Sequence, residues 1–372
     1  MPDTPPRISP GRCTCLRVVE VKRVTALAGV WAAVLVAVGV PGVKAQLGGV
    51  AGVACSTPPP LHCPDGECPR ELIARKGNTL LPKSRLDFFL DYPCDLKPAE
   101  RVTFVLSLHG GGMNANWQRH YFPIVDLKDK YRLVIATPNA VRALWNAEND
   151  DAHLQSIVTF VYDTFGAKNI TAFWLAGHSN GGSTANRLSR IAFYRDRLTG
   201  WVSLSGGRLG SNRAHAPRGS ESPYLLPTSP EAPASRPADF QRRGEPGVGL
   251  TDASDLPDGA FSYIYSSGEY ELTAAGLPDG SKWAQRLGCQ AQTRLPEIVD
   301  RKAGYVWDAR SRLTRSTWGG RRPTPGRARL FVYPQCPGGR VVADVIRLGK
   351  GHTEGLEPNV TEAIVKLMVS AR

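Results

Sequence analysis

Short apolar runs with the chemistry of β-strands alternate with a helical pattern from about Ser84 onward. The runs end in small or turn-forming residues, as strands of a sheet commonly do. Residues 151–166 instead repeat their apolar side chains at helical spacing and stop at Gly166. Strands that alternate with helices predict an α/β fold with a mostly parallel central sheet and helices on both faces. The four strand-like runs are residues 85–93, 101–109, 132–139 and 170–177.

Residues 207–259 interrupt this pattern, because they hold eight prolines and keep no sustained period. Such an insertion is either a surface loop or a lid that shapes a substrate site. Regular structure is expected again beyond it, within one domain over residues 84–372. The expected elements are strands in 261–271, 329–335 and 340–349 and helices in 282–289 and 360–372.

The N-terminus has the sequence pattern of a signal peptide. Basic residues, among them Lys22 and Arg23, precede a sixteen-residue apolar stretch at 25–40, which is short for a membrane span. Val43 and Ala45 are the small residues expected before a cleavage site near Ala45. We expect residues 1–45 to be removed and the mature protein to be secreted or periplasmic, with no stable membrane insertion. An uncleaved membrane anchor is the alternative.

Export accounts for the cysteines and leaves the chain basic. Cleavage removes six basic and two acidic residues, which lowers the net charge from +13 to +9. The six remaining cysteines favour three disulfides. Several of these cysteines lie in a Cys-rich segment at 46–83. No second Cys/His pair follows "CPDGEC" at the spacing of a zinc finger, so we expect no metal and no cofactor.

The strand-like run at 170–177 leads directly into "GHSNG", which fits the pattern Gly-x-Ser-x-Gly with Ser179 at its centre. Gly177 and Gly181 lack the Cβ atoms that would clash in a sharp turn from strand to helix. Such a strained turn points the serine hydroxyl out of the top of the sheet. We therefore interpret Ser179 as a nucleophile, in preference to an incidental turn rich in Gly and Ser.

A serine nucleophile needs backbone donors for the oxyanion that its attack creates. "LHGGGMN" follows the strand-like run at 101–109, and its glycines allow close approach of a substrate oxygen. The backbone N–H groups of Gly111 and Asn180 are the expected donors. A phosphate loop is excluded, because no Gly-Lys-Ser/Thr follows.

The serine also needs a base and an acid, which follow it along the chain in this topology. Only His215 and His352 lie beyond Ser179, and His352 follows the last predicted strand, so it is the expected base. The acid should follow the strand in 261–271, where Glu271 is preferred and Glu269 is the alternative. Asp252, Asp255 and Asp258 precede that strand and are outsiders.

Together these motifs resemble the secreted esterases grouped with poly(3-hydroxybutyrate) depolymerases and feruloyl esterases, which are α/β-hydrolases. The motifs are "LHGGG", "GHSNGG", a Gly-x-x-acid loop, Trp283 with Cys289, and "YPQC…GKGHT", in the order of that family over residues 84–372. The resemblance implies an α/β-hydrolase fold, a disulfide between Cys289 and Cys336, and hydrolysis of an ester substrate. Polyhydroxyalkanoate oligomers and aryl or feruloyl-type esters are the implied substrates.

The chain departs from that family at three places. Its acid loop carries Glu271 where the family has aspartate, and the family's tryptophan two residues after the histidine is Glu354 here. The insertion at 207–259 is longer than the family pattern. These departures leave the identity of the acid, one wall of the site and the substrate open.

Two other functions compete with an esterase. The basic stretch 301–329, with Trp307 and Trp318, could bind a polyanion on a catalytically inactive hydrolase scaffold. A solvated surface explains it better, so no nucleic acid partner is expected. A serine peptidase is the other alternative, although the sequence shows no pocket for a peptide side chain. The sequence does not predict the oligomeric state.

Overall fold

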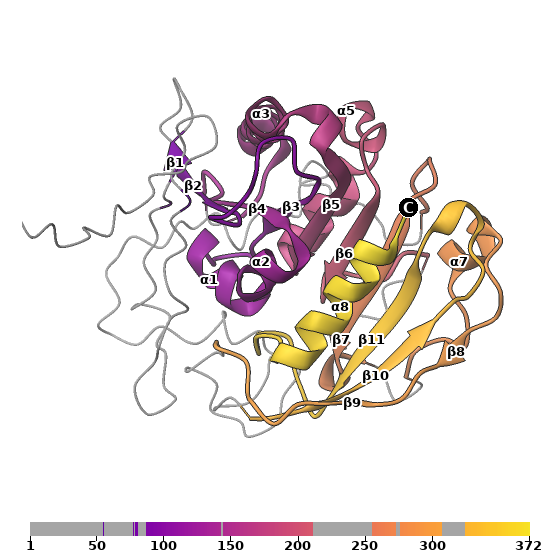
Figure 1. Cartoon of the computed structure of the whole chain (residues 1–372). Coiled ribbons are helices and arrows are strands. Elements are labelled where there is room, and N and C mark those ends of the chain that lie inside the picture. Colours follow the sequence, from indigo (N-terminus) through magenta and orange to yellow (C-terminus); the bar gives the residue numbers. More distant parts are fainter. Residues whose placement is uncertain are drawn as a thin grey trace, which may run out of the picture. The chain divides into compact units, whose positions relative to one another are not determined.

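The strands of the described chain form one twisted sheet (Figure 1). The computed structural model describes residues 55, 77, 79–80, 87–142, 144–210, 255–272, 276–306 and 324–372, all within the unit Leu47–Arg372. The predicted signal peptide, Cys63, Cys68, Asp252, His215, Trp307, Trp318 and most of the insertion lie outside these residues.

The central strands run parallel, as the sequence predicts. Within the described ranges the strand order is β1-β2-β4-β3-β5-β6-β7-β11-β10-β8, and β9 pairs with β10. The strands from β4 to β11 in this order are parallel, whereas β2 and β10 are antiparallel to their neighbours. Strand β2 is antiparallel to β4, and β4 lies between β2 and β3 in the sheet although it follows β3 along the chain. This strand order is that of the α/β-hydrolase fold. The strands are β1 (Thr79–Leu80), β2 (Asp87–Asp91), β3 (Val102–Leu108), β4 (Leu133–Pro138), β5 (Ile170–His178), β6 (Gly200–Leu204), β7 (Ser262–Gly268), β8 (Thr293–Arg294), β9 (Ile298–Val299), β10 (Arg327–Val332) and β11 (Val342–Leu348).

Helices cover both faces of the sheet. Alternate side chains of one strand enter opposite cores: Phe104 and Leu106 of β3 pack on one side and Val105 on the other. The Val105 side holds apolar residues of α1, α2 and α8, which lie over one face in Figure 1. The opposite core holds apolar residues of α3, α4, α5 and α7. The helices are α1 (Ala115–Tyr121), α2 (Lys128–Tyr131), α3 (Ala147–Phe165), α4 (Asn180–Leu188), α5 (Ala192–Arg195), α7 (Lys282–Leu287) and α8 (Pro358–Ser370), and short 3₁₀ turns include Ile124–Leu127 and Glu269–Glu271.

Helix α3 begins earlier than its apolar pattern predicts. The Asn146 side chain accepts a hydrogen bond from the N–H of Glu148 at 2.8 Å and caps a first turn that carries no apolar stripe. The helix ends where expected, at Gly166, whose φ of 83° suits glycine. Within the described ranges, no helix combines the length and apolarity that a membrane span requires.

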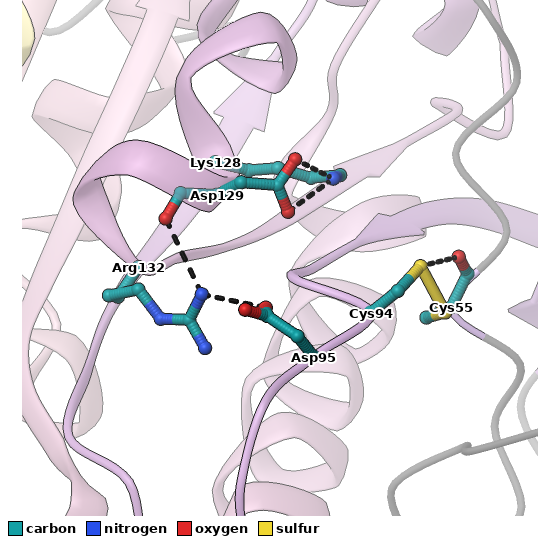
Figure 2. The surroundings of a disulfide bond; sticks show 6 residues. All are labelled: Cys55, Cys94, Asp95, Lys128, Asp129 and Arg132. Carbon is teal, nitrogen blue, oxygen red and sulfur yellow. Dashed lines mark hydrogen bonds and ion pairs between the residues drawn. A yellow bond between two sulfur atoms is a disulfide. The ribbon is translucent and has the colours of Figure 1, made fainter. Parts of the chain in front are cut away.

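Two disulfides join cysteines within the described residues. Cys289 is joined to Cys336, the pairing that the resemblance implies. Figure 2 shows Cys94, shortly after β2, joined to Cys55, a pairing that the sequence left open. Beside this second disulfide, Asp95 pairs with Arg132 at 2.8 Å (Figure 2).

Candidate active site

Ser179 stands at the junction between β5 and α4. Its backbone has φ 51° and ψ −115°, a left-handed conformation that a non-glycine residue rarely adopts. Its N–H donates to the carbonyl of Leu204 at 2.9 Å, which ties the turn to the end of the neighbouring strand β6. The strand, the strained turn and the helix follow one another as the Gly-x-Ser-x-Gly pattern requires.

The glycines of this turn allow three backbones to meet. A Cβ on Gly177 would overlap the carbonyl of Gly181, and a Cβ on Gly181 would overlap the carbonyl of Leu108 at the end of β3. The turn that carries Ser179 therefore packs directly on the start of the "HGGG" loop. Any larger residue at either position would push these loops apart.

His352 and Glu271 meet at the same edge of the sheet. His352 follows β11 and Glu271 follows β7, and these two strands are parallel neighbours. The Nδ1 of His352 lies 2.6 Å from Oε2 of Glu271. The ring of His352 also lies 4.8 Å from the ring of His178, the residue before Ser179. The structure thus brings all three stretches to the carboxyl ends of β5, β7 and β11.

Hydrogen bonds hold the Glu271 carboxylate in place. Its Oε1 accepts from the hydroxyl of Ser205 at 2.7 Å and from the N–H of Gly268 at 2.9 Å. Burial alone would raise the pKa of Glu271, but the charge and hydrogen bond of His352, with the donors on Oε1, bring it below its usual value. Oε2 is left to face the imidazole as part of an ionised carboxylate.

The other acidic candidates lie elsewhere. Oε2 of Glu269 accepts from the N–H of Gly349 at 2.8 Å, so this carboxylate fastens the loop after β11 instead of contacting the imidazole. Asp255 pairs with Arg190, and Asp258 lies 3.9 Å from Arg286. Of the carboxylates weighed from the sequence and described here, Glu271 is the one that reaches His352.

The two residues expected to supply oxyanion donors are neighbours. A Cβ on Gly111 would stand 3.6 Å from the Cβ of Asn180. The Asn180 side chain is held by the N–H of Trp145, which donates to its Oδ1 at 2.9 Å. Trp145 Nε1 in turn donates to the carbonyl of His109 at 2.8 Å. These contacts join the "HGGG" loop, the loop before α3 and the Ser179 turn.

A buried ionic cluster includes Glu354, at the position where the resemblance drawn from the sequence implies tryptophan. Glu354 is 4% exposed, and its Oε2 accepts from the N–H of Gly351 at 2.8 Å. Lys350 lies 3.8 Å from Glu354 and 3.0 Å from Glu357, which also pairs with Arg347 at 3.1 Å. This network braces the His352 loop from within.

Comparisons with known proteins find a likeness in structure alone. No protein-family profile matches the sequence, and a comparison with curated proteins finds no match. An acetyl xylan esterase from Aspergillus awamori is 13% identical, with a TM-score of 0.41 over 77% of this chain and 95% of that chain. Esterase 2 of Thermogutta terrifontis is 14% identical, with a TM-score of 0.34 over 50% of this chain and 68% of that chain. At these values no substrate is carried over, and the function is argued below from the residues of this chain.

Sequence reasoning did not find the residues that support the site. Ser205 follows β6, which the sheet places between the strands that lead to Ser179 and Glu271. Tyr121 and His178 contact the main chain of His352. Tyr121 and Ser205 belong to no motif, and His178 occupies the variable position of the serine motif. The strand order, once known, points to Ser205, whereas the contacts of Tyr121 and His178 emerge only from the packing of the loops.

Proposed function

We propose that this protein is a serine esterase that cleaves carboxylic esters through an acyl-enzyme. Ser179 is the nucleophile, His352 the base and Glu271 the acid. The observation that carries the proposal is the 2.6 Å contact between Glu271 and His352 at the sheet edge where the strained Ser179 turn stands. A binding protein would need none of these three features together.

The proposed reaction is acyl transfer to the serine and then to water. With the proton of Nδ1 directed at Glu271, the Nε2 of His352 is free of a proton and takes that of Ser179 as its oxygen attacks the ester carbonyl. The N–H groups of Gly111 and Asn180 stabilise the oxyanion. The imidazolium then gives its proton to the departing alcohol. Water, deprotonated by the same imidazole, releases the acid and restores Ser179.

The proposed substrate class and the proposed cellular location rest mainly on the sequence. The resemblance to depolymerases and feruloyl esterases supports polyhydroxyalkanoate oligomers or aryl esters as substrates. The signal-peptide grammar of residues 1–45 and the two disulfides support export, because disulfides persist in oxidising compartments.

A serine variant with a matched control tests the proposal. Wild type should hydrolyse members of a panel of acetyl, butyryl, feruloyl and hydroxybutyrate esters and react covalently with a fluorophosphonate. Ser179→Ala should lose labelling and lower kcat by roughly 10⁴-fold or more. Ser183→Ala, one helical turn further on, should keep both.

Equal turnover by wild type and Ser179→Ala would remove the esterase proposal. Retention on heparin that weakens steeply with salt, without turnover, would favour the polyanion-binding alternative. Cleavage of peptides but not of esters would favour a peptidase.

A further inference from the structure

The main-chain carbonyl of His352 accepts hydrogen bonds from two side chains that are distant in sequence. The hydroxyl of Tyr121, at the end of α1, lies 3.1 Å from it, and Nε2 of His178, at the end of β5, lies 2.9 Å from it. A carbonyl oxygen offers only lone pairs, so both groups must donate. This fixes the proton of His178 on Nε2.

Both donors are buried and their rings are in contact. Tyr121 and His178 are each 1% exposed. The rings of Trp117 and Tyr121 are 4.8 Å apart, those of Tyr121 and His178 are 3.9 Å apart, and those of His178 and His352 are 4.8 Å apart. The rings of Trp117 and His178 are also only 5.4 Å apart, so Trp117, Tyr121 and His178 form a compact cluster that contacts the imidazole of His352. Each ring leaves its neighbour little room to move.

The other edge of the His178 ring lies against the "HGGG" loop. A Cβ on Gly110 would overlap Nδ1 of His178, and no hydrogen-bond partner faces that nitrogen in the described structure. If the His178 ring were protonated, its Nδ1 would carry a second N–H with no acceptor among the described residues. The ring is therefore a fixed neutral donor wedged between Gly110 and His352, and it is not a second base.

We propose that Tyr121 and His178 are positioning residues, which hold the His352 loop by its carbonyl so that the imidazole stays in register with the Ser179 turn. This inference rests on the esterase function proposed above and deepens it. His178 is part of the Gly-x-Ser-x-Gly motif. The residue directly before Ser179 therefore also holds the loop that carries His352. Neither side chain takes part in proton transfer.

Tyr121→Phe tests this role, because it removes one oxygen and keeps the ring. Its kcat on a short p-nitrophenyl ester should fall about tenfold, which corresponds to one lost hydrogen bond, while KM stays nearly unchanged. Tyr194→Phe is the matched control: Tyr194 is 1% exposed and its hydroxyl lies 3.5 Å from a main-chain carbonyl, that of Asp151 on α3, yet it touches no residue of the site. This control should keep kcat.

Two variants of His178 separate the donor from the shape of the ring. His178→Leu should lower kcat at least as much as Tyr121→Phe. His178→Gln, whose amide also donates, should recover part of that loss. Equal kcat for Tyr121→Phe and Tyr194→Phe, or no recovery by glutamine in a variant that unfolds at the wild-type urea concentration, would overturn the proposal.

Hydrogen–deuterium exchange keeps the test independent of turnover. Exchange in residues 349–357 should be faster in Tyr121→Phe than in wild type and Tyr194→Phe. Unchanged exchange there overturns the positioning role whatever the esterase assay shows. Faster exchange in a protein whose wild type cleaves no ester would retain the positioning role and reject the esterase function.

Discussion

Backbone strain occurs at two residues of the candidate site. Among the described residues, five that are not glycine have positive φ, and two of these, Ser179 and Ser205, stand at the nucleophile turn and beside the Glu271 carboxylate. Each such conformation costs on the order of 1–3 kcal/mol and persists only where the surroundings enforce it. The glycine contacts around Gly177 and Gly181 provide that enforcement for Ser179.

Two neighbouring glutamates allow the acid to be tested by a matched pair of variants. Glu271→Gln replaces the carboxylate that faces His352 with an amide, which can turn its N–H toward Nδ1 and favour the wrong tautomer. We expect kcat to fall by roughly 10³-fold or more. Glu269→Gln keeps an acceptor for the N–H of Gly349, so kcat should change by about twofold at most. The reverse ranking would assign the acid to Glu269.

The pKa of Glu271 limits the pH range in which this carboxylate itself can be protonated. The pKa of Glu271 in the folded protein lies below its ordinary value of 4.5, so the ionised form is the stabilised one. Its contribution to stability is present above the unfolded pKa and is lost as the pH falls through the folded pKa. Loss of kcat from this group is therefore confined to pH values below 4.5.

At the scale of elements, the loop after β11 is held by buried charge. Arg347 donates to the carbonyls of Glu354 and Gly355 at 2.7 and 2.8 Å, so one guanidinium closes the loop between His352 and α8. Burial would raise the pKa of Glu357, but Arg347 and Lys350 bring it below its usual value. Buried hydrogen bonds and ion pairs therefore hold this loop in place.

Glu357→Ala should cost far more stability than removal of an exposed pair. It leaves Arg347 buried without its carboxylate, and we expect the free energy of unfolding to fall by about 3–5 kcal/mol. Lys130→Ala removes an exposed lysine, 63% of whose side chain is accessible, from its pair with Glu362, and should lower the free energy of unfolding far less. Urea unfolding of both variants measures the difference. Equal losses would contradict the role given to the buried cluster.

The elements themselves could be predicted, whereas the contacts between loops could not. The strand-like runs and the helix in 151–166 follow from apolar spacing, which reports burial along a single segment. Tyr121 lies 231 residues before the carbonyl that it binds, and His178 lies 174 residues before it. Spacing within a segment carries no information about such partners. The apolar pattern predicts the start of α3 too late for a related reason, because the capped first turn of this helix has no apolar stripe.

At the scale of the whole molecule, the candidate site and the Cys289–Cys336 disulfide lie at opposite ends of the parallel strands. Ser179, Glu271 and His352 follow the carboxyl ends of parallel strands. Strand β10 is antiparallel to β11 and pairs Val332 with Ala343 near the start of β11, so Cys336 follows β10 at the opposite end. The Cys289–Cys336 disulfide therefore lies away from the site.

Removing this disulfide should lower stability and leave catalysis intact. With a sequence separation of 47, the loop entropy that the disulfide removes from the unfolded chain amounts to about 4 kcal/mol. The Cys289→Ser/Cys336→Ser variant should unfold at lower urea concentration and keep the kcat of wild type at 25 °C. An unchanged unfolding midpoint, or a kcat lost before unfolding begins, would contradict this separation of tasks.

The place of β11 also determines when activity can arise during synthesis. This strand follows all the other described strands along the chain, yet it lies between β7 and β10 in the sheet. A ribosome that has not yet reached residue 342 has made a chain with a gap in its sheet and no imidazole for Ser179. Under the proposed function, hydrolytic competence is then a late event in the synthesis of each chain, because the proposed base follows the last of the described strands to be made.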